Sequence, residues 1–246
     1  MPRKQPRETI HRPVVWIVGA SRGIGKEIAK QFASIGCEVC LSSRSTPSLQ
    51  KVIAEINNLG GRGYSFPCDI SRQNEILRTA KRIEKKFGRI DILINNAGIT
   101  SFKTIADDSL KMINDLIETN LIGPIVCIKA VLPGMIERKS GWIISILSTV
   151  AVKTFTRAGI YTATKEGLYG FTKVLREEMR ANNIKVMNII PGATETDIWR
   201  PEARQKFGFR MMKPEAVAEA VLSAYRMPEG VVVEDIVLRP ILGDLT

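Results

Sequence analysis

The stretch VVWIVGASRGIGKEIAKQF, residues 14–32, joins an apolar run to an amphipathic segment through a glycine-rich turn. This turn contains two motifs that predict different functions. As G-x-S-x-G centred on Ser21, it is typical of the nucleophile elbow of a serine hydrolase. As a triplet of Gly19, Gly23 and Gly25, it is typical of a turn that binds the pyrophosphate of a dinucleotide. Both motifs require a strand that runs into a helix, so the choice depends on the rest of the chain.

Short runs rich in Val and Ile alternate with longer amphipathic segments along the chain. The runs predicted as strands are residues 14–18, 38–43, 62–66, 91–95, 142–147, 184–190 and 231–238. The segments predicted as helices are residues 23–35, 46–59, 71–87, 106–138, 159–182 and 213–227. Such alternation implies parallel strands joined by right-handed crossovers. We therefore predict an α/β protein with a single-domain Rossmann fold, in which a doubly wound sheet of seven parallel strands has helices on both faces.

The chain of 246 residues is predicted to form one domain, residues 13–246, behind a flexible basic tail, residues 1–12. The tail is basic like a transit peptide, but its prolines oppose a helix, and it lacks the apolar core of a secretory signal. No apolar run reaches the roughly 18 residues of a membrane span. We therefore expect a cytoplasmic protein with no membrane partner. Residues 193–212 follow a predicted strand without a clear element of their own, which favours a substrate lid.

The formal charge of +11 does not by itself indicate a nucleic-acid partner. The basic residues are interleaved with acids and apolar residues and form no long block, so we interpret them as a solvated surface and expect no nucleic acid. Cys37 and Cys40 have C-x-x-C spacing but lie in a predicted strand, where their side chains would face opposite ways. We expect structural thiols in a reducing compartment.

Histidine usage decides between the two functions of the glycine-rich turn. A serine hydrolase of the α/β type needs a histidine after its nucleophile, but the only histidine, His11, precedes the first predicted strand. The same scarcity excludes His-rich zinc motifs, and no carboxylate cluster has metal-ligand spacing, so we predict no metal. The turn then serves a dinucleotide: Gly19 permits the tight turn, Gly23 lets the backbone approach a phosphate, and Gly25 lets the helix pack on the sheet.

The end of the second predicted strand indicates which dinucleotide binds. An acid at this place would hold the ribose 2′-hydroxyl of NAD, whereas arginine suits a 2′-phosphate. The strand ends in Ser42, Ser43 and Arg44, and Arg22 lies in the nearby turn. Two hydroxyls and two guanidiniums suit a phosphate, although either arginine alone could be an exposed loop residue. We predict NADP(H) as the cofactor.

Hydride transfer to a carbonyl also needs a proton donor for the developing alkoxide. Tyr161 and Lys165 are four residues apart on a predicted helix and therefore share a face. A nearby ammonium favours the phenolate form of a tyrosine, whose usual pKa is about 10. This pair is the candidate acid-base unit, although the same spacing is common on helix surfaces.

From Val14 onward the chain resembles the short-chain dehydrogenase/reductase family over nearly its whole length. The matching motifs are the glycine turn (Gly19, Gly23, Gly25), NNAG from Asn95 to Gly98, Asn120 in ETNLIG, Ser148 in IISILSTVA, the Y-x-x-x-K pair Tyr161 and Lys165, and PGATETD from Pro191. Val18 and Thr164 stand where the family often has threonine and serine, which are mild departures.

The resemblance implies a role for each of four catalytic residues. Tyr161 would donate the proton to the carbonyl oxygen, and Ser148 would hydrogen-bond and orient that oxygen. Lys165 would bind the nicotinamide ribose and lower the pKa of Tyr161. Asn120 would hold a water that links Lys165 to solvent, and its backbone would kink the helix.

The glycine turn and the resemblance together imply a set of cofactor-binding residues. They are Gly19, Ser21, Arg22, Gly23, Ile24, Gly25, Ser43, Arg44, Asp69, Ile70, Asn96, Ala97, Gly98, Tyr161, Lys165, Pro191, Gly192, Thr194 and Thr196. Asp69 would meet the adenine, Asn96 the cofactor ribose region, and Thr196 the carboxamide. Two of these assignments have structural alternatives, since Asp69 could cap the helix that begins near Ser71 and residues 95–98 could mainly brace the sheet.

Two substrate classes remain open for a reductase of this kind. One is a 3-oxoacyl thioester on an acidic acyl-carrier protein, which could meet Arg138, Lys139, Arg176 and Arg180 at neighbouring helix ends. The other is a small ketone, keto acid or 3-hydroxy acid, whose carboxylate could meet Arg200, Arg204 or Arg210 in the lid. The tail after Val231 looks more like a branch acting on small hydroxy acids and weakens the acyl-carrier case.

Two further expectations concern the protein as a whole. Some proteins of this fold have lost their catalytic residues and serve as NADPH sensors or scaffolds, but here all four residues of the tetrad are present, which favours an enzyme. The resemblance also implies a homotetramer or homodimer that assembles through the two long helices at residues 106–138 and 159–182.

Overall fold

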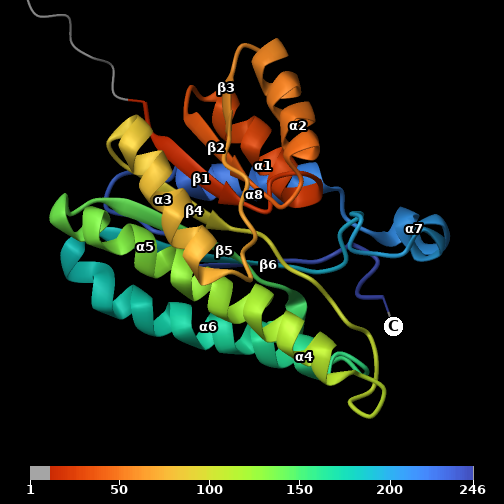
Figure 1. The fold of residues 1–246 in the computed structure, drawn as a ribbon. Coiled ribbons are helices and arrows are strands. Elements are labelled where there is room, and N and C mark those ends of the chain that lie inside the picture. The colour runs from red at the N-terminus through yellow and green to blue at the C-terminus, as the bar shows by residue number, and fades with distance from the viewer. Residues whose placement is uncertain (1–11, 246) are drawn as a thin grey trace, which may run out of the picture.

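The computed structural model describes residues 12–245 and confirms the predicted doubly wound α/β fold (Figure 1). The strands are β1 (Val14–Val18), β2 (Glu38–Ser42), β3 (Arg62–Ser65), β4 (Ile92–Asn95), β5 (Gly141–Ile146), β6 (Ile184–Pro191) and β7 (Asp235–Leu238). All seven are parallel and lie in the order β3-β2-β1-β4-β5-β6-β7. The predicted tail lies outside the described residues except for Arg12.

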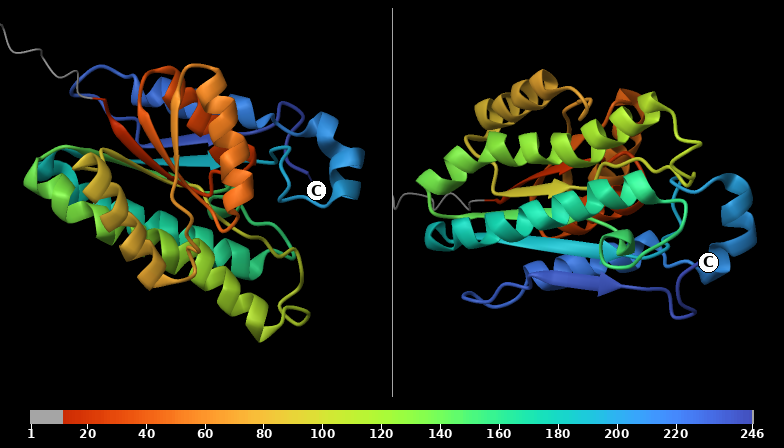
Figure 2. Two further views of the ribbon diagram at one scale, coloured as in Figure 1. Left: turned by 45° about the horizontal axis from the view of Figure 1, so that its top comes forward. Right: turned by 90° about the horizontal axis from the view of Figure 1, so that it is seen from below.

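Helices cover both faces of the sheet. They are α1 (Gly23–Ser34), α2 (Thr46–Asn58), α3 (Gln73–Phe87), α4 (Leu110–Ile117), α5 (Gly123–Glu137), α6 (Gly159–Met179), α7 (Pro201–Phe207) and α8 (Pro214–Tyr225). The layer with α1, α2 and α8 lies on one face, and the layer with α3, α4, α5 and α6 lies on the other (Figure 2). The strands point to the side on which α7 lies (Figure 2).

Continuous apolar runs form the central strands because both faces of the sheet are buried. Every residue of β1 is buried, with Val15 and Ile17 in one core cluster and Trp16 in the other. Ile28 of α1 packs in the first cluster, and Ile83 of α3 packs in the second. This double core fixes where the strands end, and so positions the loops at their carboxyl ends.

The side chains of Cys37 and Cys40 lie on opposite faces of the sheet, as predicted. Cys37 lies in the core cluster on one side of the sheet, and Cys40 lies in the cluster on the other side. These two, together with Cys68 and Cys127, are free and buried. Burial raises the pKa of the Cys37 thiol to about 12, so it stays protonated at neutral pH. The C-x-x-C spacing is therefore a packing feature.

The helix predicted at residues 106–138 is a run from Leu110 to Glu137 that contains a π-helical turn, Glu118–Ile122, between α4 and α5. By length and composition alone this run could cross a membrane. In the fold, α5 lies beside the sheet between α3 and α6 (Figure 1). A helix in this position supplies apolar side chains to the core, which accounts for its composition.

Two predictions about the carboxyl-terminal third need correction. The strand predicted at residues 231–238 begins only at Asp235, because β6 pairs with it from Asn188 onward. The segment 193–212 is not free of regular structure: it contains α7, a 3₁₀ turn at Gly208–Arg210 and a bridge between Thr194 and Met212. Pro201 begins α7, where its fixed φ angle favours a helix start.

Candidate active site

The glycine turn and the NNAG segment brace each other at the carboxyl ends of β1 and β4. Gly19 has a φ of +86°, and a Cβ on it would lie 2.6 Å from the Cα of Ala97. The Asn96 side chain donates to the Gly19 carbonyl at 2.7 Å, and a Cβ on Gly25 would overlap both of these groups. The turn therefore needs glycine at both positions, and Asn96 and Ala97 pack against it.

The first turn of α1 is open toward a ligand. Arg22 is the N-cap residue, and its side chain makes no capping hydrogen bond to this turn. Gly23 has a φ of +55°, and a Cβ there would lie 3.0 Å from the Thr196 methyl carbon. Uncapped N–H groups and the helix dipole suit a phosphate, so this turn fits a dinucleotide pyrophosphate. The structure thus places Thr196 beside the glycine turn, while Ser21 in the turn is partly exposed.

The end of β2 supplies fewer phosphate ligands than the sequence suggested. The Ser42 hydroxyl is fully buried, accepts from the Trp16 indole at 2.9 Å and donates to the Phe66 carbonyl at 2.6 Å. It is therefore committed to the core, because both of its hydrogen-bonding roles are filled. Ser43 is partly exposed and Arg44 is exposed, so these two residues remain available to a 2′-phosphate.

Arg22 and Asp69, two of the expected cofactor-binding residues, differ in the contacts of their side chains. The Arg22 guanidinium is 68% exposed and 3.9 Å from the carboxylate of Asp197, in the predicted lid. The Asp69 carboxylate accepts from the backbone N–H of Ser71 at 3.1 Å and from its hydroxyl at 2.8 Å. Asp69 thus holds the turn before α3 but does not cap that helix, because α3 begins at Gln73 with Arg72 as its N-cap residue.

Two expected cofactor residues are packed into the cores. Ile24 packs against the cluster under α1, and Ile70 is buried in the cluster on the other face, where it contacts Gly123 at the start of α5. At the end of β6, Gly192 donates its N–H to the Leu238 carbonyl at 2.7 Å, and the Thr194 hydroxyl donates to the Gly192 carbonyl at 3.0 Å. These contacts fix the loop after Pro191, which closes β6.

Asn120 ties the loop after β4 to α6. It is fully buried in the π-helical turn, where its side chain accepts from the Ile99 N–H and donates to the Ile99 carbonyl, both at 2.9 Å. Its amide also lies 3.3 Å from the Thr164 hydroxyl on α6. The widened turn therefore places Asn120 at the junction of the tetrad, in agreement with the irregular helix expected there.

Lys165 is a buried cation at the centre of the site, with 4% of its surface exposed. Its ammonium donates to the Ile146 carbonyl at 2.9 Å and lies 6.0 Å from the centroid of the Tyr161 ring. Burial lowers the pKa of Lys165 to about 8. A Cβ on Gly98 would lie 3.6 Å from this ammonium and 3.3 Å from the Asn120 amide oxygen, so glycine gives both groups their room.

Tyr161 is 7% exposed, and the nearby Ser148 hydroxyl affects its pKa. Burial raises the pKa of Tyr161 to about 12, and the hydrogen bond from Ser148 partly opposes this rise. The net direction is opposite to that expected from the Lys165 ammonium alone. The reason is that desolvation of the phenol dominates, while the ammonium faces the Ile146 carbonyl.

Two aromatic residues near Tyr161 were not predicted from the sequence as part of the site. Phe102, in the loop after β4, meets the Tyr161 ring edge-on with centroids 6.3 Å apart. Phe102 also stacks on Trp199 of the lid, with centroids 5.4 Å apart and an interplanar angle of 11°. Their positions in the sequence could have indicated a place in the site. Phe102 follows the NNAG segment and Trp199 precedes α7, so both lie on loops that leave the carboxyl ends of strands.

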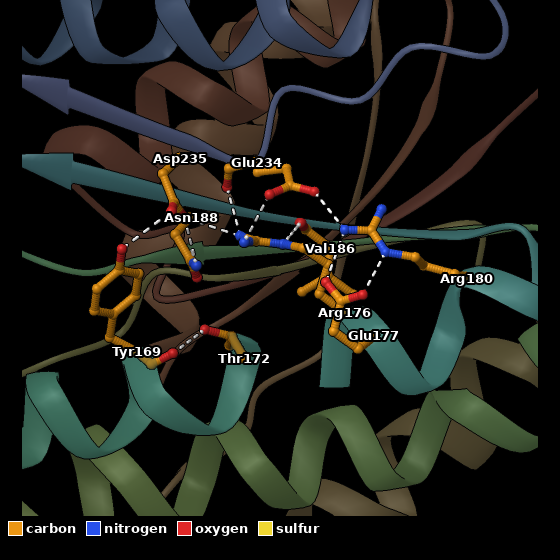
Figure 3. A network of polar contacts seen from close by, with 9 residues as sticks. All are labelled: Tyr169, Thr172, Arg176, Glu177, Arg180, Val186, Asn188, Glu234 and Asp235. Carbon is orange, nitrogen blue, oxygen red and sulfur yellow. Dashed lines mark hydrogen bonds and ion pairs between the residues drawn. The ribbon is translucent and has the colours of Figure 1, made fainter. Parts of the chain in front are cut away.

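The cations proposed to receive an acyl-carrier protein are largely engaged within the fold. Arg176 is 6% exposed and donates to the Val186 carbonyl at 3.1 Å, the Glu234 carbonyl at 2.8 Å and the Asp235 carboxylate at 2.9 Å (Figure 3). Arg180 pairs with Glu177 and Glu234.

Arg138 donates to the Ile90 carbonyl, while Lys139 is exposed. All four cations lie near the ends of α5 and α6, where β5 and β6 begin, and therefore at the edge of the sheet opposite Tyr161. Within one chain these four cations therefore do not line the mouth of the site.

The lid cations are also partly engaged. Arg204 pairs with Asp197 at 2.7 Å, and Arg210 donates to the backbone carbonyls of Leu242 and Asp244 at 3.3 and 3.4 Å. Arg200 is exposed. Within residues 12–245, no cluster of three or more His, Cys, Asp or Glu side chains could hold a metal ion.

Comparison with known proteins agrees with this geometry. A profile of the short chain dehydrogenase family matches residues 13–206. The chain is 33% identical over 239 residues to sepiapterin reductase of Chlorobaculum tepidum, a match that covers 94% of this chain and 98% of that protein. It is 36% identical over 217 residues to carbonyl reductase family member 4 of Xenopus laevis, covering 86% and 90%.

Among solved structures, a metagenomic short-chain oxidoreductase in complex with NADP has the same fold, with a TM-score of 0.82 and 30% sequence identity. The match covers 93% of this chain and 96% of that chain. The sequence match, the sheet order and the presence of all four tetrad residues lead to one assignment. The chain belongs to the short-chain dehydrogenase family and is an oxidoreductase.

Proposed function

We propose that this protein is an NADPH-dependent carbonyl reductase, or an alcohol dehydrogenase in the reverse direction. The observation that carries the proposal is the buried Tyr161, whose pKa responds to the nearby Ser148 hydroxyl, with the Lys165 ammonium 6.0 Å from the centroid of its ring. This group lies at the carboxyl edge of the sheet, the same edge as a glycine turn that is open to a phosphate. Ligands of doubly wound sheets bind at this edge.

Tyr161 is the proton donor in this proposal. Its raised pKa keeps the hydroxyl protonated at neutral pH, so it can give a proton to a carbonyl oxygen that gains negative charge. Ser148 can donate a hydrogen bond to the same oxygen and hold it in place. Bound NADPH would supply the hydride.

Lys165 and Asn120 support these two hydroxyls. One ammonium proton of Lys165 goes to the Ile146 carbonyl, and the others can reach ribose hydroxyls, which would align the cofactor with Tyr161. Asn120, held on both sides by Ile99, would position the water that connects Lys165 to solvent.

NADP(H) is the proposed cofactor because of the charges around its expected 2′-phosphate. Arg44 and Ser43 follow β2 with exposed or partly exposed side chains, and the Arg22 guanidinium is 68% exposed. The related oxidoreductase structure that contains NADP supports this assignment. Asp69, Asn96 and Thr196 remain proposed contacts to the adenine, ribose region and carboxamide.

The proposed substrate is a small-molecule ketone. The acyl-carrier alternative loses its basis at Arg176, which is buried and paired. The small keto or hydroxy acid alternative keeps Arg200 as an exposed cation in the lid, residues 193–212. A catalytically silent NADPH sensor is not favoured, because all four residues of the tetrad are present and Asn120, Tyr161 and Lys165 are buried. We also propose a cytoplasmic homodimer or homotetramer.

The direct test is a panel assay with purified full-length protein. NADPH and NADH oxidation would be followed with small ketones, keto acids and an acetoacetyl thioester. The proposal predicts turnover of at least one ketone, faster with NADPH. Tight NADPH binding without turnover of any carbonyl would support the sensor instead.

A further inference from the structure

Three rings form a continuous row from the proton donor to the lid. Phe102 meets Tyr161 edge-on at 6.3 Å and stacks face to face on Trp199 at 5.4 Å. The three residues come from α6, the loop after β4 and the lid, so the row joins separate segments at one place. Phe102 keeps 41% of its surface exposed. The row therefore presents an aromatic surface to a molecule that approaches the Tyr161 hydroxyl.

The loops around this row carry further exposed apolar side chains. Ile105 is 66% exposed and Leu110 is 80% exposed in or just after the loop that holds Phe102. Ile198, next to Trp199, is 41% exposed, and Val152, in the segment after Ser148, is 44% exposed. All of these segments leave the carboxyl ends of β4, β5 or β6. Apolar surface gathered at one place on a protein marks a ligand site more often than scattered apolar residues do.

The cations that would recognise a carboxylate are less available than the rings. Arg204 is bonded to Asp197, and Arg210 is bonded to the carbonyls of the carboxyl-terminal segment. Binding a substrate carboxylate at either residue would require these contacts to break. Of the three lid arginines, only Arg200 is exposed, so the lid offers an anionic substrate fewer ready contacts than it offers an apolar one.

We propose that Phe102 and Trp199 determine substrate specificity by binding the flat apolar body of an aromatic ketone. This inference rests on the proposed reductase function and narrows its substrate class. In the reaction, the carbonyl carbon gains a hydride from NADPH, which becomes NADP⁺, and the carbonyl oxygen gains the Tyr161 proton. The product is a secondary alcohol. Offset or edge-on contact between aromatic rings favours such a substrate over a saturated one of similar size.

The test compares three methyl ketones that differ in the rest of the molecule: acetophenone is aromatic, cyclohexyl methyl ketone is saturated, and acetoacetate is anionic. Wild-type enzyme should have the highest kcat/KM for acetophenone. In Trp199→Ala and Phe102→Ala, this value should fall about 10-fold or more, mainly through KM, while that for acetoacetate changes less than about 3-fold. Trp199→Phe should restore most of the loss. Phe209→Ala is the matched control, because Phe209 is an 80% exposed lid aromatic with no ring contact to Phe102 or Trp199.

Binding gives a second readout that does not depend on turnover. Acetophenone added to the NADP⁺ complex should quench tryptophan fluorescence in the wild type but not in Trp199→Phe. Equal quenching in both proteins, a wild-type preference for acetoacetate, or equal losses for all three substrates in Trp199→Ala would overturn the inference. If no carbonyl compound is turned over, the reductase function itself fails, and the quenching result still decides whether the aromatic pair binds a ring.

Discussion

Burial of the Lys165 ammonium makes the contribution of this group to the stability of the cofactor-free fold less favourable at neutral pH than at alkaline pH. The pKa of this amine is 10.5 as a reference value and about 8 in the fold. Below pH 8 the amine is charged in both states, so the folded state carries the full desolvation penalty. Between pH 8 and 10.5 the unfolded chain binds more protons, and the contribution of this group to stability rises with pH.

Lys165→Met should therefore stabilise the cofactor-free protein at pH 7. The shift corresponds to about 3 kcal/mol, reduced by about 1 kcal/mol for the lost hydrogen bond to Ile146, which leaves about 2 kcal/mol. Urea unfolding at pH 7 and pH 10 measures this, and the gain should shrink at the higher pH. Lys111→Met, at a side chain that is 84% exposed, is the control and should change little. A gain independent of pH would contradict the assignment.

Arg44 offers a separate test of cofactor choice. Removing a guanidinium that binds a phosphate removes charged hydrogen bonds, which are worth about 1.5–3 kcal/mol. Arg44→Ala should therefore raise the KM for NADPH about 10-fold or more and leave that for NADH nearly unchanged. Arg226→Ala, at an exposed residue after α8, serves as the charge-matched control. An equal effect on both cofactors would count against a 2′-phosphate site at this residue.

At the scale of elements, Arg176 connects α6 to β6 and β7. Its guanidinium bonds to the Val186 carbonyl, to the backbone of Glu234 and to the Asp235 carboxylate (Figure 3). Asn188 donates to the same carboxylate at 2.9 Å. Since β7 is at the edge of the sheet, this network is a main polar attachment of that strand.

Arg176→Ala should destabilise the protein by about 3–5 kcal/mol, because it leaves buried acceptors and a carboxylate without their cation. Arg180→Ala, at a solvent-exposed ion pair, should lower the stability far less, because water screens exposed charges. Urea unfolding at pH 7 measures both. Arg176 lies about 22 Å along α6 from Tyr161, so the folded variant should keep its kcat. Selective loss of kcat with unchanged stability would show that the network serves the site instead.

The hydrophobic pattern of the sequence predicts best those elements that are buried along their whole length. Strands such as β1 and β4 are buried on both faces, so an unbroken apolar run marks them within a residue or so. The π-helical turn at Glu118–Ile122 has no such signal, because it depends on how Asn120 bonds to Ile99 across the chain. α7 was missed since its buried face is small and only Pro201 marks its start.

The tetrad and the glycine turn could be read from sequence, because each needs particular residue types at fixed spacing. The side chains and backbone groups that contact the predicted residues could not be predicted from the sequence. The commitment of the Ser42 hydroxyl to Trp16 and Phe66, and the burial of Arg176, depend on contacts between distant segments. The same holds for the stacking of Phe102 on Trp199, which are far apart in the chain and meet only in the fold.

At the scale of the whole molecule, α6 and the run from α4 to α5 carry apolar side chains that the single chain does not cover. Val174 of α6 is 60% exposed, and Ile136 of α5 is 39% exposed. The proposed assembly would bury this surface in a symmetric contact.

Sedimentation velocity should show a dimer or tetramer, and Val174→Glu should shift it toward smaller species by placing a charge in the contact. Leu59→Glu, at a residue that is 75% exposed after α2, should leave the assembly unchanged. A monomeric wild type at micromolar concentration would refute assembly through these helices.

The central claim is that Tyr161 donates the proton in NADPH-dependent carbonyl reduction. Single-turnover oxidation of bound NADPH by a reactive ketone, compared between wild type and Tyr161→Phe, tests it most directly. The account predicts that the rate falls about 10²–10⁴-fold, the usual contribution of positioned acid-base catalysis, while the Kd for NADPH stays within about 3-fold. Near-normal reduction by Tyr161→Phe would contradict the account.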